Sequence, residues 1–554
     1  MPRPDRFRRL ERDNFDAIVV GAGISGLTAA ALLARRGLAV LVVDRHYVAG
    51  GNATVFRRKG YEFDIGIHYL GQCGPDGAIP RILKAAGAGG VRFRPLDPDG
   101  FDTLVYPDLE LRVPRGVERY RERLLEAFPR EQRAIDANAR LIEQVLGLSQ
   151  LPARPANAWR VLPQSLLALR NATSTLGQFL GRYTRDPRLC AVLAGEGGDY
   201  ALPPSRVSAL MHAGLMAHYL SDGAYYPEGG GQVMSDQLAA SIEQSGGKIL
   251  LSTSVERILV ESGKVRGVRL SNKHLGKVEV RAPIVLASND VKQALLELIA
   301  PDALGARTRR RAAGWKMAPA LGALYLGVRR EALGSRGVNT NYWIYPSYDL
   351  EQEYAEVEAG RFSRRPFLFV SSASLKDPEN PRLAPAGVVN LQLMSLAPSA
   401  PSAWRTSPEE LASGAYRESP GYLAAKAEYS ERLLAAAESV FPGLGHHVVF
   451  QELATPLTHA RYTSSTGGTS YGIAATPDQF LWRRPGPKTE ISGLYLCGAS
   501  ARSGHGIMGA MMGGLAAAAE ISGAELVRET LDGPEHDARS DRRGLGLRGD
   551  AQRA

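Results

Sequence analysis

The feature that most constrains this chain is a glycine-rich turn between a short apolar strand and a helix of small residues. The run 17–20 predicts a buried strand, and Gly21, Gly23 and Gly26 follow in the pattern GxGxxG before a helical stretch of Ala and Leu. A second apolar run then ends at Asp44. Strand, glycine turn, helix, strand and acid in this order predict a βαβ unit.

Each part of this unit has a mechanical role in holding a dinucleotide. Gly21 makes the turn, Gly23 lets a pyrophosphate approach the backbone, and Gly26 lets the helix and the strand pack closely. The helix N-terminus presents free N–H groups to the phosphates. Asp44 is placed to accept a hydrogen bond from a ribose hydroxyl. The unit therefore predicts a bound dinucleotide rather than a purely structural turn.

Composition places this unit in a large globular protein. The 554 residues are 44% hydrophobic and 22% charged, which predicts two domains with sizeable interiors. Lys and Arg outnumber Asp and Glu by 67 to 57, a net charge of +10. These basic residues are scattered and form no stripe of the kind that reads nucleic acid, so we expect no nucleic-acid partner.

Cysteine usage and the absence of long apolar runs bear on the compartment. Cys73, Cys190 and Cys497 show neither a CxxC pair nor zinc-ligand spacing, which argues for a reducing compartment and against a metal site. No apolar run reaches the roughly 18 residues of a membrane span. We therefore expect a cytoplasmic protein, with peripheral contact to the inner face of the membrane as an open alternative. The charged, glycine-containing stretch 534–554 is expected to be disordered.

The segment after the βαβ unit bears on which dinucleotide is bound. The run "RHYVAGGNATVFRRKGYEFDIGIHYLG" resembles the corresponding segment of glutathione-reductase-type flavoproteins in the amine oxidase and phytoene desaturase group. In that group a GG pair, here Gly50 and Gly51, makes a second backbone approach to the cofactor. A strand pair then leads to a DxGxH motif, here Asp64, Gly66 and His68. The resemblance implies FAD rather than a nicotinamide.

Two further segments resemble the return of this family to its cofactor domain, and one position departs from the pattern. In the stretch "GGGQVMSDQLAASIEQSGGKILLSTSVERILV" a helix and two strands lead to Val255, whose counterpart in relatives offers backbone groups to the adenine. The run "RAPIVLASND" predicts a core strand that ends at Asn289 near the cofactor. Many members have Arg directly after the GG pair, whereas this chain has Asn52, which leaves one cofactor contact open.

A late segment narrows the resemblance. The runs "ATPLTHARYTSSTGGTSYGIAATPDQF" and "GLYLCGASARSGHGIMGAMMGG" resemble the branch that contains carotenoid isomerase, retinol saturase and their bacterial relatives. The similarity extends over almost the whole chain apart from its two charged tails. It implies action on carbon–carbon double bonds of long polyene lipids, by desaturation, saturation or isomerisation. A helix that begins at about Met508, after Gly504 and Gly506, is expected to aim its N-terminus at the flavin.

These observations predict an α/β protein with a discontinuous FAD domain. We expect an FAD-binding Rossmann-like domain of the glutathione-reductase type from residues 1–75, 228–295 and 485–525, and an α+β substrate domain from 76–227 and 296–484. The runs "LGALYLGV", "PFLFVSSAS" and "GVVNLQLMS" predict strands of a sheet beside the substrate cavity. No second GxGxxG loop opens another βαβ unit, so no dedicated nicotinamide domain is expected.

The candidate site residues come from all of these motifs. Those expected to contact FAD are Gly21, Gly23, Ile24, Ser25, Gly26, Asp44, Arg45, Gly50, Gly51, Asn52, Gly66, His68, Val255, Asn289, Gly498, Ala499, Gly506, Ile507 and Met508. Saturation or isomerisation also needs a proton donor. His505 is the first candidate, because its neighbours place it beside the flavin, and Tyr471 is the second. His68 and Tyr69 are further candidates, with His68 more suited to orienting the cofactor or its loop.

Three functions remain open at the level of sequence. The first is FAD-dependent chemistry on double bonds of an apolar lipid, with oxygen, quinone or reduced nicotinamide as the unresolved electron partner. The second is an amine oxidase-like enzyme that oxidises C–N bonds. The third is a flavin-free escort of prenylated proteins with the same fold. Apolar residues beside Arg160, Arg170, Arg182 and Arg185 suit either a face resting on lipid or an ordinary solvated helix.

Overall fold

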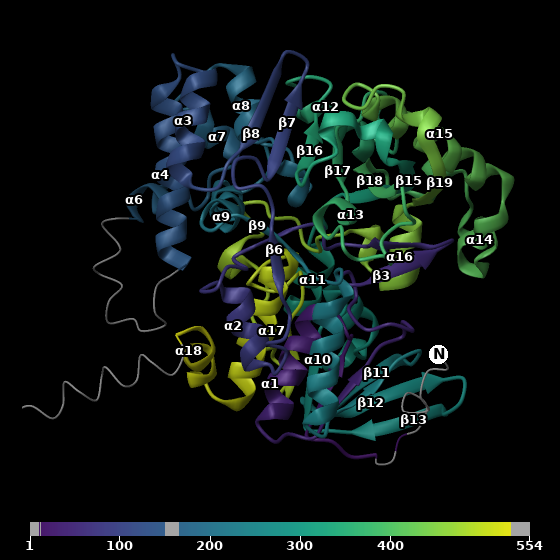
Figure 1. Cartoon of the computed structure of the whole chain (residues 1–554). Coiled ribbons are helices and arrows are strands. Elements are labelled where there is room, and N and C mark those ends of the chain that lie inside the picture. The colour runs from purple at the N-terminus through teal and green to yellow at the C-terminus, as the bar shows by residue number, and fades with distance from the viewer. Residues whose placement is uncertain (1–9, 11–12, 150–164, 533–554) are drawn as a thin grey trace, which may run out of the picture.

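The computed structural model describes residues 10, 13–149 and 165–532, shown in Figure 1. The stretch 534–554, expected to be disordered, lies outside these residues. So do Arg160 and the rest of 150–164, within the region considered for lipid contact.

A five-stranded parallel sheet carries the N-terminal glycine motif. Its strand order is β10-β2-β1-β14-β20. The strands are β1 (Ala17–Val20), β2 (Val40–Val43), β10 (Lys248–Leu250), β14 (Ile284–Ala287) and β20 (Leu494–Leu496). Because all five run in one direction, their C-terminal ends meet at a single edge, where ligands bind in open α/β sheets. The sheet thus joins segments that lie far apart in the sequence.

Both faces of this sheet are covered, because successive side chains of a strand point to opposite sides. Ala17 and Val19 pack into a core formed with four helices, while Ile18 and Val20 pack into a second core with an antiparallel three-stranded sheet. The helices are α1 (Ile24–Arg35), α2 (Ala78–Ala85), α10 (Gln232–Gln244) and α17 (Gly506–Ser522), with α18 (Glu525–Leu531) beside them in the lower half of Figure 1. The antiparallel strands are β11 (Ser254–Glu261), β12 (Lys264–Asn272) and β13 (Gly276–Arg281).

A seven-stranded mixed sheet organises the upper half. Its order is β19-β15-β18-β17-β16-β7-β8, and within it β16 and β7 run parallel while the other neighbouring pairs are antiparallel. The strands are β7 (Asp102–Tyr106), β8 (Leu109–Val113), β15 (Ala320–Arg329), β16 (Asn341–Ile344), β17 (Leu368–Ser371), β18 (Val388–Ala397) and β19 (Val448–Ala454). The three strands predicted from the apolar runs are β15, β17 and β18.

Alternation along β15 again separates two cores. Leu324 and Leu326 pack against α15 (Pro420–Ala437), whereas Ala323 and Tyr325 face a helical layer on the opposite side of the sheet. That layer, at the upper left of Figure 1, contains α3 (Val117–Ala127), α4 (Gln132–Ser149), α6 (Leu166–Arg170), α7 (Leu176–Leu180), α8 (Pro187–Leu193) and α9 (Ala209–Leu220). The cavity described below opens on this second face.

Further short strands and helices lie beside these sheets. The strands are β3 (Val55–Arg58), β4 (Tyr61–Asp64), β5 (Leu70–Gly71), β6 (Phe93–Pro95) and β9 (Ala224–Pro227). The helices are α11 (Ala306–Gly314), α12 (Glu351–Glu358), α13 (Ala373–Lys376), α14 (Pro408–Ser413) and α16 (Pro456–Thr463). Helix α2, just beyond the expected boundary at residue 75, buries its apolar side chains in the core around α1 and α17. The predicted domain boundaries stay predictions.

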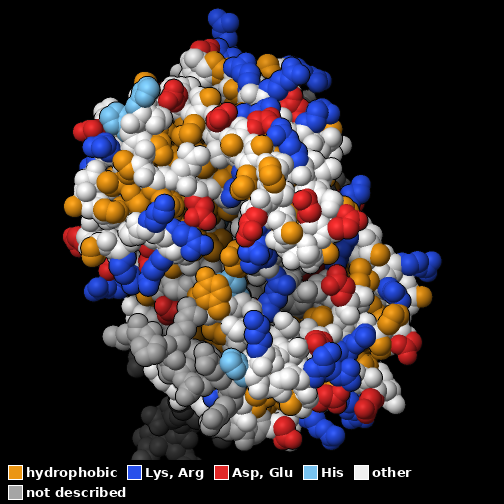
Figure 2. All heavy atoms as spheres, turned by 90° about the vertical axis from the view of Figure 1, so that its right-hand side faces the viewer, with side chains coloured by type: hydrophobic (Ala, Val, Ile, Leu, Met, Phe, Trp, Pro, Cys, Tyr) orange, Lys and Arg blue, Asp and Glu red, His pale blue; other side chains and the backbone are white. Residues whose placement is uncertain are grey.

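The surface mixes charges of both signs. Figure 2 shows basic and acidic side chains interspersed on one face, and many are paired, as Arg432 is with Glu428 at 2.7 Å. Among the described residues, no helix combines the length and apolarity that a membrane crossing requires. The same residues contain no cluster of three or more His, Cys, Asp or Glu arranged to hold a metal ion.

Candidate active site

The first glycine loop has the geometry that the sequence predicts. Gly21 has φ +102°, in the region that favours glycine, and follows β1 directly. A Cβ on Gly26 would stand 2.3 Å from the carbonyl oxygen of Gly21, so only glycine lets α1 pack this closely on the loop. A Cβ on Gly23 would meet no atom within 4 Å. Gly26 therefore serves packing, while Gly23 leaves open space at the start of α1.

The second glycine pair lies against the first loop. Gly50 and Gly23 form a parallel β-bridge, and the N–H of Gly50 donates to the carbonyl of Ala22 at 2.7 Å. Gly51 has φ +59°, and its Cβ would stand 3.1 Å from the Cα of Gly23. The backbone of the GG pair therefore lies directly beside the first glycine loop at the start of α1, as the resemblance implies.

Asp44 is fixed by backbone donors rather than by a free rotamer. Its Oδ2 accepts from the N–H of Ala22 at 2.7 Å and its Oδ1 from the N–H of His46 at 2.7 Å. Burial raises the pKa of the Asp44 carboxyl, and these two donors act against that rise. The guanidinium of Arg45 donates to the carbonyl of Arg461 at the end of α16. The carboxyl of Asp44, the predicted ribose acceptor, is thus fixed in one orientation. Arg45 links the segment after β2 to helix α16.

Helix α17 reaches the same region from the other end of the chain. It begins at Gly506, two residues before the predicted start, with His505 as N-cap. Further along, a Cβ on Gly514 would stand 2.3 Å from the carbonyl oxygen of Ser25, and the Oγ of Ser25 accepts from the N–H of Gly498 at 2.9 Å. The small residues of this helix therefore do both jobs considered from the sequence: they pack on α1 and they open a helix start toward the site.

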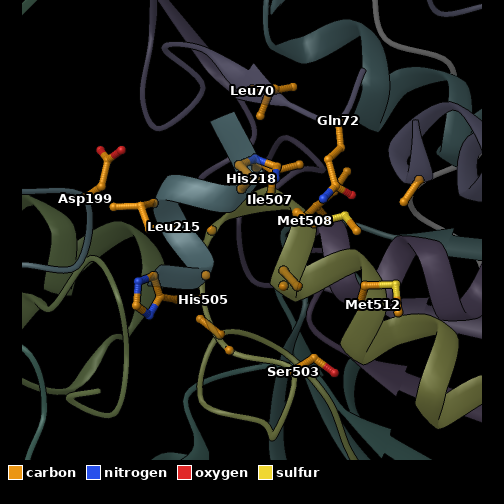
Figure 3. A pocket seen from close by; sticks show the side chains of 18 of the residues that line it. Leu70, Gln72, Asp199, Leu215, His218, Ser503, His505, Ile507, Met508 and Met512 are labelled. Atoms are coloured by element: carbon orange, nitrogen blue, oxygen red, sulfur yellow. The ribbon is translucent and has the colours of Figure 1, made fainter. Parts of the chain in front are cut away.

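Two cavities with shared walls run along these loops. The larger has a volume of about 2090 Å³ and the smaller about 650 Å³, against roughly 300–1,000 Å³ for an ordinary small-ligand site. Gly23, Asn52, Ser288 and Ala499 belong to the walls of both. Figure 3 shows the larger cavity, with Ile507 and Met508 at the start of α17.

The predicted contact residues are distributed over these two cavities. The larger is lined by Gly23, Ile24, Ser25, Gly50, Asn52, Gly66, His68, Gly498, Ala499, Gly506, Ile507 and Met508. The smaller is lined by Gly21, Gly23, Asp44, Arg45, Gly51, Asn52, Val255, Asn289 and Ala499. Gly26 lines neither, because its role is the close packing described above. That each of these residues contacts the cofactor stays a prediction.

The residues present fit FAD. The starts of α1 and α17 both open on the larger cavity, so two sets of first-turn N–H groups face it. The Oδ1 atoms of Asn52 and Asn289 are buried and, among the described residues, have no hydrogen-bond partner. A polar ligand in these cavities satisfies such atoms. The two cavities together have room for a dinucleotide and for a further long molecule.

The predicted proton donors His505 and Tyr471 line the larger cavity, and burial shifts the pKa of each. The rings of His505 and Tyr471 are 5.0 Å apart between centroids. Burial first, and then the charge of Arg484, lowers the pKa of His505 to about 3, so the imidazole is neutral near pH 7. Burial lowers the pKa of His68 to about 3 and raises that of Tyr471 well above 10. The proton-donor roles of His505 and Tyr471 stay predictions, and burial leaves the His505 imidazole with a single N–H near pH 7.

A carboxyl that the sequence analysis missed lies in the same wall. Asp199 ends a short turn of residues 197–199, and its Oδ2 lies 2.9 Å from the hydroxyl oxygen of Tyr69 and 3.2 Å from that of Tyr219. The two tyrosine rings stack 4.4 Å apart at 6°. Burial, and then the charge of Asp102, raises the pKa of Asp199 to about 7. Figure 3 shows Asp199 on the same side of the cavity as Leu215 and His505.

The signal for Asp199 was present in its neighbours. It follows the pair Gly197 and Gly198 inside a helical, mostly apolar region. A Cβ on Gly198 would stand 2.4 Å from the ring of Trp343, so the glycine lets this acidic turn approach the large sheet. An acid after a GG pair in a buried helical region was the available clue.

Comparisons with known proteins agree with this geometry. A family model described as flavin containing amine oxidoreductase matches residues 24–522. All-trans-retinol 13,14-reductase of Danio rerio is 29% identical, with 94% of this chain and 88% of that protein covered. The chloroplastic prolycopene isomerase of Arabidopsis thaliana is 24% identical, with 94% and 85% covered.

Solved structures share the fold. An oxidoreductase from Methanosarcina mazei has a TM-score of 0.59 and 20% identity, with 90% of this chain and 98% of that chain covered. Putrescine oxidase bound to putrescine has a TM-score of 0.61 and 16% identity, with 92% and 99% covered. At these identities the likeness is one of fold alone, and the predicted fold, α/β with an FAD-type domain and a substrate domain, is confirmed.

Proposed function

The chain belongs to the family of flavin-containing amine oxidoreductases, and from this premise we propose that it is an FAD-dependent enzyme acting on carbon–carbon double bonds of an apolar polyene lipid. The family confirms the predicted flavin cofactor. The named relatives confirm the resemblance to the retinol saturase and carotenoid isomerase branch. Carotenoids and retinoids are the substrate class that those names support.

One observation carries the proposal: the cavity at the two helix starts continues into a large, mainly apolar space. The walls farthest from the glycine loops come from the upper half of the molecule. They include Leu215 on α9 and, on the seven-stranded sheet, Leu321, Phe369 and Met394. These side chains offer contact surface without fixed charge. A long hydrocarbon chain fits such a lining, and a small polar substrate would leave most of it unused.

The division of labour between cofactor and chain follows from these walls. Bound FAD supplies two-electron chemistry by giving or accepting a hydride. The first turn of α1 and Asp44 would hold its pyrophosphate and ribose, and the start of α17 would place N–H groups against its ring system. The apolar walls of the larger cavity, around Leu215 and Leu321, hold the lipid and keep water away from the reacting carbons.

The amine alternative rests on the family description and on the fold shared with putrescine oxidase. A cationic amine needs ionised or strongly polar acceptors, which Asp199 would supply when ionised, whereas most of the surrounding wall is apolar. The buried lysine of this region, Lys376, donates to the carbonyl of His68 and the hydroxyl of Ser371 and does not line the cavity. The escort alternative has no use for intact cofactor loops. Both are therefore weaker than the polyene proposal.

We further propose a cytoplasmic location with peripheral contact to the inner face of the membrane. Polyenes have very low solubility in water, so the substrate must come from a bilayer or a carrier. Leu166 and Leu169 on α6 are half exposed beside Arg170, which supports a lipid-facing patch. The electron partner, for which oxygen, quinone and reduced nicotinamide are the candidates, belongs to the same proposal.

A product-mass experiment tests the function. Oxidised and reduced holoenzyme are incubated separately with carotenoids, retinoids and polyunsaturated lipids in liposomes. A gain of two hydrogens indicates saturation, a loss of two indicates desaturation, and an unchanged mass with altered retention indicates isomerisation. No product from any polyene, together with anaerobic bleaching of the flavin by polyamines or amino acids, would establish the amine alternative instead.

A further inference from the structure

We propose that Asp199 is the proton-transfer residue of this cavity, a neutral carboxylic acid that gives its proton to a double-bond carbon of the polyene and accepts it back. This inference rests on the proposed function. It replaces His505 and Tyr471, the donors expected from the sequence, with a residue outside every recognised motif.

The hydrogen bonds of the Tyr69 hydroxyl show that either Asp102 or Asp199 carries a proton. The hydroxyl oxygen of Tyr69 lies 3.0 Å from Oδ2 of Asp102 and 2.9 Å from Oδ2 of Asp199. A tyrosine has a single hydroxyl hydrogen, so it donates to only one of them. The other contact needs a hydrogen from the carboxyl itself. One of the two acids must therefore be protonated for both contacts to be hydrogen bonds.

The surroundings of Asp102 assign that proton to Asp199. Oδ1 of Asp102 accepts from Nδ2 of Asn341 at 2.8 Å, and Oδ2 accepts from Nε1 of Trp343 at 3.1 Å. Lys376 adds a favourable positive charge nearby. These N–H donors stabilise the ionised form of Asp102. Among the described residues, the Asp199 side chain has only the hydroxyls of Tyr69 and Tyr219 as hydrogen-bond partners, and a hydroxyl can also accept a hydrogen bond.

The electrostatics of the wall agree with this assignment. Burial and the neighbouring charge of Asp102 raise the pKa of Asp199 to about 7, and the pKa of Asp102 rises only to about 6 because donors oppose the effect of burial. Asp199 therefore changes its charge in the neutral range, as a proton-transfer group should. The titratable groups that interact with it come from several elements: Tyr69, Asp102, Glu196, Tyr200, Tyr219, Tyr471 and, through the Asp199 backbone, His505.

The chemistry balances in both redox-neutral and reductive use. The π electrons of a polyene double bond form a C–H bond with the proton of Asp199, and the O–H bond breaks. Positive charge then spreads over the conjugated chain, and the Asp199 carboxylate is its counter-charge. Rotation about the former double bond and return of the proton give isomerisation. For saturation, bound reduced FAD would supply the two electrons and the hydrogen that neutralise the cation, and Asp199 then takes a proton from solvent.

The first test is Asp199→Asn, with Glu353→Gln as a matched control. Glu353 is another buried acid, whose pKa burial raises to about 8, but it lies outside the cavity wall and accepts from the N–H of Phe367 and the hydroxyl of Ser395. We expect D199N to keep FAD and bind polyene while turnover falls about 100-fold or more. E353Q should keep wild-type turnover. An active wild type with an equally active D199N overturns the proposal.

A second measurement does not depend on turnover. The infrared difference spectrum between wild-type and D199N holoenzyme should isolate one protonated carboxylic acid band that fades as the pH rises through about 7, while the bands of Glu353 and the other buried acids are common to both proteins. Absence of this band in the wild type at pH 5.5 would also refute the inference. If the wild type converts no polyene, the proposed function fails and the catalytic role fails with it, even where the band identifies the acid.

A third variant tests the role of Asp199 even if D199N does not fold. Tyr219→Phe removes one donor that lowers the pKa of Asp199. The acid form should then persist to higher pH, so the band and the descending limb of the pH–rate profile should both move upward. A merely structural role of Asp199 would leave the limb in place, and that result counts against the proposal.

Discussion

At the scale of single residues, the three glycines of the first loop have different physical reasons. Gly21 is needed for its backbone angle, Gly26 for close packing, and Gly23 for the open space beside it. Gly21 and Gly26 affect folding, because a side chain at either position would force the loop or helix α1 to move. Gly23 acts on the ligand, because nothing in the protein occupies the volume that a side chain there would fill.

This difference predicts opposite outcomes for two identical substitutions. Gly26→Ala places a methyl 2.3 Å from the Gly21 carbonyl oxygen and should lower the free energy of unfolding by about 1–3 kcal/mol. Gly23→Ala should leave the stability of the flavin-free protein unchanged and weaken FAD roughly tenfold, about 1.4 kcal/mol. Thermal unfolding of the apoprotein and a flavin fluorescence titration separate the two effects. Equal loss of stability in both variants would contradict the assignment.

At the scale of elements, the site depends on how two helices cross. Helices α1 and α17 come from opposite parts of the sequence, yet Gly514 touches the backbone of Ser25, next to the phosphate-binding turn. The crossing sets where both helices begin, and both beginnings line the cavity. A change at the crossing should therefore be felt at the cofactor.

Gly514→Ala tests this coupling. The added Cβ would stand 2.3 Å from the carbonyl oxygen of Ser25, so the helices must separate, and we expect a loss of stability of about 1–3 kcal/mol together with weaker FAD binding. Glu520→Ala, on an exposed position of the same helix, should change neither beyond about 0.5 kcal/mol. Calorimetry of the apoprotein and FAD titration measure both quantities. FAD affinity unchanged in G514A would show that the crossing does not position the helix starts.

The sequence predicted local elements better than the long-range cluster around Asp199. The strand 17–20 and the glycine loop were predicted correctly, and the start of α17 was predicted to within two residues. All three depend on patterns of neighbouring residues, which can be recognised in the sequence. Asp199 meets Tyr69, Tyr219 and Asp102 only because the helical layer folds onto the large sheet. The acidity of His505 was also out of reach, because burial by distant segments sets it.

At the scale of the whole molecule, the cavity joins two separately built halves. The parallel sheet and its helices supply the walls suited to FAD, and the mixed sheet with α9 supplies the apolar walls. Substitutions on the second set of walls should therefore affect the lipid and spare the cofactor.

Leu215→Trp examines this separation. Leu215 lines the cavity from α9, and a larger ring there should block the apolar arm, so polyene affinity should drop tenfold or more, about 1.4 kcal/mol. Flavin content should stay at the wild-type level. Leu423→Trp, at a half-exposed position of α15, is the control that changes neither. Flavin absorbance per protein and polyene quenching titrations supply the readouts. Loss of flavin in L215W would mean that the two halves of the cavity are not independent.

The order of the strands in the parallel sheet has a consequence for biosynthesis. Strand β1 and helix α1 are synthesised long before β20 and α17, which complete their sheet and their cavity, and β14 follows only after about half of the chain. Contacts of such large sequence separation form slowly. The glycine loop is therefore made before its partners in the sheet, and we expect FAD to bind only after α17 has folded onto α1.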